Sequence, residues 1–178
     1  MNDTRIVLDH NEETHSTTER EDIILDSQDL DLSSRIKRLE DIEEIKRLKF
    51  RYCSLCDVGF DADELSKLFT EDAVWEAGEP WGNFTGPKAI GEFFRTCPDS
   101  IGFSYHAVSN GEIDVDGDSA KGRWRTIIPC SLKGEEGLVP TWMFCDYDEE
   151  YRRVNGRWLF SRVVGDVKRA APHSDGWE

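Results

Sequence analysis

The sequence predicts an α+β fold in which N-terminal helices lie against a cone-shaped, curved antiparallel sheet and enclose a pocket. Two observations support this fold class. Helix-type patterns occupy the first part of the folded region, and strand-type patterns joined by hairpin turns occupy the rest. A long antiparallel sheet whose ends have no partner must curl, and helices packed on its concave face leave a cavity between them.

The helical region is predicted to begin at Ser33 or Ser34, either of which can cap the first turn. From there apolar residues recur at steps of three and four, which indicates one long amphipathic helix that ends before Gly59. These residues are Ile36, Leu39, Ile42, Ile45, Leu48, Tyr52 and Leu55. A second, short helix is predicted over 61–69. A third is predicted over 87–97, because proline suits the first helical turn.

Strand patterns follow the helices and alternate with turn signals. A first strand is predicted over 73–77, before a turn-rich segment, and the chain changes to β structure after Pro98. The hairpin signals are Asp116-Gly117-Asp118 and Asn155-Gly156, and the second is typical of a type I′ turn. The later strands are predicted over 104–115, 120–130, 141–154 and 157–166, with a loop at 133–137.

The 178-residue chain is long enough for one domain with a core, which we place at residues 33–167. Residues 1–32 are predicted to be an acidic flexible tail, and residues 168–178 a C-terminal tail. The formal net charge of -15 disfavours nucleic acid and anionic membranes as partners, because like charges repel. With no apolar membrane span and five cysteines without disulfide spacing, we expect a cytoplasmic protein with reduced thiols.

Asp57 and His106 carry the predicted chemistry. Asp57 ends the long helix, where the macrodipole disfavours an acidic side chain. His106 is predicted to lie mid-strand, and an imidazole can take and return a proton near neutral pH. A carboxylate bonded to one ring nitrogen would fix the tautomer and support the imidazolium. The alternatives stay open: a solvated or capping Asp57, and a core histidine that donates to a backbone carbonyl.

Tyr52 precedes Asp57 by five residues, and a phenol in a pocket can polarise a substrate oxygen by donating a hydrogen bond. It can equally be an aromatic residue of the core stripe. The predicted pocket-lining aromatic residues are Trp75, Trp81, Trp124, Trp142 and Phe94. We expect neither a cofactor nor a metal, because phosphate-loop, dinucleotide, HExxH and EF-hand patterns are absent. The CxxC of Cys53 and Cys56 has no second pair.

Several of these segments resemble SnoaL-like proteins, which belong to the nuclear-transport-factor-2-like superfamily of curved α+β barrels. The matching segments are 42–57, 68–75, 105–110, 113–120, 122–124 and 151–158, and the resemblance covers about residues 35–166. The chain looks most like the lyase branch, which contains bile-acid 7α-dehydratase, scytalone dehydratase and hexachlorocyclohexane dehydrochlorinase. The resemblance implies a His–Asp dyad at Asp57 and His106, with Tyr52 at the position of a pocket tyrosine.

The resemblance also marks departures from that branch. Ile128 stands where the bile-acid enzyme has a further pocket acid, and it is therefore expected to line the pocket as an apolar residue. A second histidine of scytalone dehydratase, near Trp124, is absent. The residue that would protonate a leaving hydroxyl is thus missing.

The resulting expectation is a cofactor-independent lyase, of dehydratase or elimination type, that acts on a small apolar cyclic, polyketide-like or steroid-like substrate. An isomerase or cyclase of the same fold, and a non-catalytic small-molecule binder, stay as alternatives because one fold hosts many functions. Apolar residues on exposed strands predict a homo-oligomer, either a dimer or a trimer.

Overall fold

The computed structural model describes residues 31–173, and the chain divides into two units after Arg38. The predicted tail over 1–32 therefore lies almost entirely outside the described residues. Helix α2 (Leu32–Asp57) begins in the first unit. Asp31 caps it, because its carboxylate accepts hydrogen bonds from the Ser34 backbone N–H at 3.0 Å and from the Ser34 hydroxyl at 3.1 Å. This corrects the predicted serine cap, and the same bonds lower the pKa of Asp31.

The sheet and the candidate site lie in the second unit, which in the described part of the chain is 39–173. There α2 buries one stripe at steps of three and four, which confirms the predicted long helix. The buried residues of the stripe are Asp41, Ile45, Leu48, Lys49, Tyr52, Cys53 and Cys56. Leu39, and Ile36 in the first unit, belong to the predicted apolar stripe but are exposed. The helix ends at Asp57 because Gly59 and Phe60 adopt left-handed φ values of 99° and 59°.

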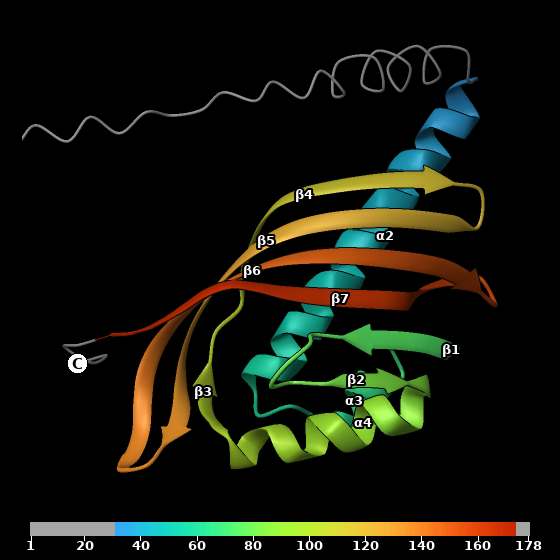
Figure 1. The fold of residues 1–178 in the computed structure, drawn as a ribbon. Helices are drawn as coiled ribbons and strands as arrows, with labels where there is room; N and C mark the ends of the chain where they lie inside the picture. Colours follow the sequence, from blue (N-terminus) through green and yellow to red (C-terminus); the bar gives the residue numbers. More distant parts are fainter. Residues whose placement is uncertain (1–30, 174–178) are drawn as a thin grey trace, which may run out of the picture. The chain divides into compact units, whose positions relative to one another are not determined.

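Residues 31–173 contain one mixed sheet of seven strands in the order β2-β1-β7-β6-β5-β3, with β4 also paired to β5. The strands are β1 (Phe69–Glu76), β2 (Asn83–Thr85), β3 (Ile101–Ser104), β4 (Ala107–Asp116), β5 (Ser119–Gly134), β6 (Gly137–Val154) and β7 (Arg157–Pro172). β1 pairs with β7 in parallel, and the other pairs are antiparallel. Register shifts between β4 and β5 and between β6 and β7 bend these long strands, which curve together in Figure 1.

The predicted hairpins are confirmed, but the strands run further than predicted. Asn155 and Gly156 both have positive φ, as a type I′ turn requires. β5 and β6 leave only two residues between them, so the predicted loop over 133–137 is largely strand. β7 runs to Pro172, which pairs with Thr141, so the predicted C-terminal tail begins too early. Residues 166–170 are exposed on both faces, and they therefore lack the alternation that reveals a strand.

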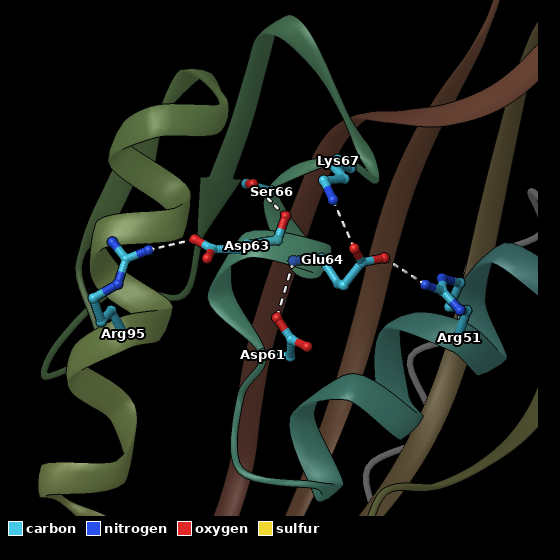
Figure 2. A network of polar contacts seen from close by, with 7 residues as sticks. All are labelled: Arg51, Asp61, Asp63, Glu64, Ser66, Lys67 and Arg95. Carbon is cyan, nitrogen blue, oxygen red and sulfur yellow. Dashed lines mark hydrogen bonds and ion pairs between the residues drawn. The ribbon is translucent and has the colours of Figure 1, made fainter.

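Two short helices precede β3: α3 (Ala62–Ser66) and α4 (Gly86–Thr96), which continues into the 3-10 helix η1 (Cys97–Asp99). Figure 2 shows the polar contacts around α3. Asp61 caps α3 by accepting from the Glu64 backbone N–H at 3.1 Å. Arg51 of α2 pairs with Glu64 at 2.7 Å, and Arg95 of α4 pairs with Asp63 at 2.5 Å. Exposed ion pairs contribute little stability, so these contacts orient α3 more than they stabilise it.

α3 is shorter than the predicted helix over 61–69, because Phe69 belongs to β1 and pairs with Phe160 of β7. On the sheet's other face, Ile127 of β5 and Phe144 of β6 are exposed apolar side chains at paired positions. The homo-oligomer that such residues suggest stays a prediction. Among the described residues, no helix is both long enough and apolar enough to cross a membrane.

Candidate functional site

The structure brings Asp57 and His106 into direct contact. The Nδ1 atom of His106 lies 2.6 Å from Oδ1 of Asp57, and the His106 backbone N–H donates to both carboxylate oxygens at 3.1 Å. An ionised carboxylate can only accept hydrogen bonds, so Nδ1 carries the ring hydrogen and Nε2 of the neutral ring holds a lone pair. Within residues 31–173, Nε2 has no hydrogen-bond partner. This arrangement can accept a proton at Nε2 while Asp57 supports the resulting charge.

The position of His106 on the sheet edge makes this contact possible. His106 was predicted to lie mid-strand, but β3 ends at Ser104 and β4 starts at Ala107. The neighbouring Tyr105 N–H still bonds the Pro129 carbonyl at 3.1 Å, and its side chain points outward. Tyr105 and Ala107 keep one register with Pro129 and Ile127 of β5, so the His106 N–H between them points away from β5. It bonds Asp57 instead, which satisfies a backbone donor that β5 would leave unpaired.

A cavity of about 70 Å³ lies beside the dyad, between the helices and the concave sheet face. It is mainly apolar and aromatic, which suits a small ring-shaped ligand. His106, Tyr52, Trp75, Trp81, Phe94 and Ile128, all named from the sequence, line it. The lining also includes Cys56, Phe60, Ala77, Phe93, Cys97, Ile101, Ser104, Cys130, Met143, Cys145, Tyr147, Gly165 and Val167.

Tyr52 is held at the cavity by aromatic neighbours and by one hydrogen bond. The Trp75 indole N–H donates to the Tyr52 oxygen at 3.1 Å, and the Tyr52 ring packs edge-on against Phe94 and Phe160. Burial raises the pKa of Tyr52 well above its usual value, so the phenol stays neutral. Because Trp75 occupies the oxygen as donor, the hydroxyl hydrogen is free to bond a ligand oxygen.

A second hollow, of about 400 Å³, lies on the other side of the dyad and is open at the protein surface. Asp57 and His106 border it together with Phe50, Cys53, Ser54, Val58, Tyr105 and Val108. His106 borders both spaces, whereas Asp57 borders only the outer one. His106 is thus the member of the dyad that contacts both the inner cavity and the surface hollow.

Trp124 and Trp142 do not line the cavity, which corrects their predicted role. Trp142 alternates with the inward-facing Met143 on β6, so it lies on the opposite face, where its ring is 6.1 Å from that of His173. Trp124 does point inward, but it stands four residues from Ile128 along β5. Its indole N–H donates to the Tyr151 hydroxyl at 3.0 Å.

Sequence reasoning missed the thiols and Tyr147 of the lining. Met143, Cys145 and Tyr147 alternate along β6, so the period-2 pattern was the available signal. Burial raises the pKa of Cys130 and Cys145 to about 11 and that of Cys97 to about 12. These thiols stay protonated near neutral pH, and a protonated thiol is a poor nucleophile.

A buried ion pair lies behind the cavity, between α2 and β6. Lys49 Nζ is 2.5 Å from Glu149 Oε1, and both side chains are fully buried. The Tyr151 hydroxyl donates to the other Glu149 oxygen. The Lys49 ammonium lies 3.6 Å from the centroid of the Tyr147 ring and 5.0 Å from that of Tyr52. Lys49 thus supports two cavity residues from behind.

In the part of the chain that the structure describes, no three side chains of His, Cys, Asp or Glu gather as a metal site would require.

The sequence profile of the SnoaL-like domain matches residues 37–164, a range that includes both residues of the dyad and most of the sheet. The chain belongs to the SnoaL-like family.

Solved structures similar to this SnoaL-like protein share its curled α+β fold. LinA is 20% identical over 82% of this chain and 98% of its own, with a TM-score of 0.74. The type 3 hexachlorocyclohexane dehydrochlorinase from Novosphingobium barchaimii is 21% identical over 80% and 97%, with a TM-score of 0.72. A candidate scytalone dehydratase from Novosphingobium aromaticivorans is 22% identical over 76% and 89%, with a TM-score of 0.68. At these identities the likeness shows the fold alone.

Proposed function

We propose that this SnoaL-like protein is a cofactor-independent lyase of the elimination type, in which His106 removes a proton from a small apolar cyclic substrate. The dyad is the observation that carries the proposal. Asp57 holds Nδ1 at 2.6 Å, which leaves the Nε2 lone pair as the base beside an apolar cavity. A positioned general base contributes about 10²–10⁴-fold to a rate.

In the proposed reaction, the electron pair of the broken C–H bond forms a carbon–carbon double bond, and a leaving group departs from the neighbouring carbon. Tyr52 donates a hydrogen bond to the departing group or to a developing oxyanion. Among the described residues, none that lines the inner cavity carries a carboxyl group. A halide or carboxylate can leave without a proton, whereas a leaving hydroxyl would have to take one from protonated His106.

The names of similar structures agree in kind with this proposal, because a dehydrochlorinase and a dehydratase both eliminate a small molecule. An isomerase is the second candidate, and the acid-free lining favours it. A dyad that returns its proton to another carbon needs no separate acid. The mass of the product discriminates between the two reactions, since only elimination lowers it.

A substrate panel tests the proposal. Cyclic β-hydroxyketones and chlorinated cyclohexanes are incubated with the protein, and products are read by mass spectrometry for loss of water or hydrogen chloride. We expect His106→Ala to lower turnover by about 10²–10⁴-fold without loss of fold. The matched control is His173→Ala, since His173 packs near Trp142 and lies outside both hollows. Wild-type turnover in His106→Ala would show that the proposal is wrong.

A further inference from the structure

Ser104, two residues before His106, has a buried hydroxyl with no bonding partner. The residue is 5% exposed, and its Oγ makes no hydrogen bond within residues 31–173. A buried hydroxyl without a partner is unfavourable, and such groups are rare in folded proteins. Ser104 also lines the cavity, where a ligand atom can supply the missing bond.

The positions of Ser104 and His106 allow one ligand to contact both. They are two residues apart in extended chain, so their Cα atoms are about 6–7 Å apart. Tyr105 between them points outward, while both neighbours line the same cavity. In a carbonyl compound the oxygen and the acidic hydrogen lie on adjacent carbon atoms, so one small ligand can present the oxygen to Ser104 and the hydrogen to His106. A hydroxyl that donates to that oxygen also stabilises the enolate formed when the hydrogen is removed.

Cys130, which pairs with Ser104 across β3 and β5, and two further lining residues do not bond the Ser104 hydroxyl. Ile101 is apolar, and Cys97 and Cys130 are neutral thiols whose sulfur atoms face backbone carbonyls at 3.6 Å and 3.5 Å. Thr126 provides a contrast, because its hydroxyl is also buried and unpartnered in the described chain, yet it does not line the cavity. Burial alone therefore does not select Ser104, whereas its place beside the base does.

We propose that Ser104 is a substrate-binding residue whose hydroxyl donates to the carbonyl oxygen next to the C–H bond that His106 breaks. The substrate class is then a cyclic ketone with a leaving group on its β-carbon. The role of the oxygen rests on the proposed function, but binding of the ketone does not require His106 to act as a base.

Binding of two small probes of similar shape tests this inference. Cyclopentanone and methylenecyclopentane differ in whether the exocyclic atom can accept a hydrogen bond, and both are small enough to suit the modest cavity. Affinities are measured by quenching of tryptophan fluorescence, since Trp75 and Trp81 line the cavity. We expect the wild type to prefer the ketone by about 5–10-fold, which corresponds to one net hydrogen bond. Ser104→Ala should abolish the preference.

Three control variants separate the alternatives. Thr126→Val removes the other unpartnered hydroxyl and should keep the preference. His106→Ala should also keep it, so a failed elimination reaction and a failed Ser104 assignment give different results. A preference that persists in Ser104→Ala but disappears in Tyr52→Phe would assign the bond to Tyr52 and overturn the inference. Equal affinity of the wild type for both probes, including no binding of the ketone, would overturn it as well.

Discussion

Two pairs of opposite ionisable side chains lie along the same helix, and their surroundings differ. Lys49 meets Glu149 where α2 crosses the sheet, and both side chains are fully buried. Asp57 meets His106 at the end of α2, where the carboxylate is 18% exposed and the imidazole 8%. The first pair is closed on all sides and the second borders two hollows.

The closed pair has bonding partners that satisfy its polar atoms. Tyr151 bonds the second oxygen of Glu149, Trp124 bonds Tyr151, and aromatic rings cover the ammonium of Lys49. The open pair keeps one ring nitrogen without a partner in the described chain. We infer that a buried pair whose hydrogen bonds are complete serves the fold, whereas a pair with one bonding position left open is available for chemistry.

Replacing the acid of the open pair should have the largest effect. In Asp57→Asn the amide can donate to Nδ1, which favours the tautomer with its hydrogen on Nε2 and removes the base. We expect turnover to fall by about 10²–10⁴-fold while the free energy of unfolding changes little, because the amide oxygen still accepts from the His106 N–H. Steady-state kinetics and ¹⁵N NMR of the ring measure both effects.

Asp61→Asn is the matched control for this change, since asparagine also caps a helix and α3 should keep its N-cap. An Asp57→Asn protein that retains full turnover, or that keeps the wild-type tautomer, would contradict the assignment of the dyad.

Breaking the closed pair should instead affect stability. Lys49→Met leaves Glu149 buried without its counter-ion, and we expect the free energy of unfolding to fall by about 3–5 kcal/mol. The double variant Lys49→Met/Glu149→Leu should lose much less, because two apolar side chains need no bonding partners. Urea denaturation of Lys49→Met, Glu149→Leu and the double variant gives the coupling energy, with Lys46→Met, whose side chain is partly exposed, as control. If the free energy of unfolding falls equally in Lys49→Met and in the double variant, the loss does not come from an unpaired Glu149, and the prediction is wrong.

The sequence indicates the open pair better than the closed one. Asp57 stands at a helix end that disfavours acids, and His106 is the one histidine within the predicted domain of residues 33–167. Each residue could therefore be identified as a candidate. Their contact came from the family resemblance, since nothing in local patterning joins positions 49 residues apart. The break at Tyr105 and His106 could not be predicted, because it depends on how two strands share one edge of β5.

The position of Lys49 in the helix pattern also indicated a buried charge. It falls on the buried stripe of α2 between Leu48 and Tyr52, where a lysine requires a buried partner. Which acid provides it, 100 residues away, depends on the sheet register. Trp142 was predicted to line the pocket because it is aromatic. Its alternation with Met143 and Cys145 along β6 instead predicts the outward face. The hydroxyl of Ser104 gives no signal in sequence, because serine is common in every environment.

The buried thiols around the cavity should give the smallest of these effects, seen only at alkaline pH. Burial raises the pKa of Cys97 to about 12 from an ordinary value near 9, so the unfolded chain releases this proton at lower pH than the folded protein. The stabilisation is complete below pH 9 and is lost as pH rises toward 12. Between pH 7 and pH 10 we expect Cys97→Ala to lose about 1 kcal/mol less stability than the wild type. Urea denaturation at both values measures this, with Ile90→Val as a buried control that does not titrate. An identical pH dependence in Cys97→Ala and wild type would show that this thiol ionises as readily in the folded protein as in the unfolded chain.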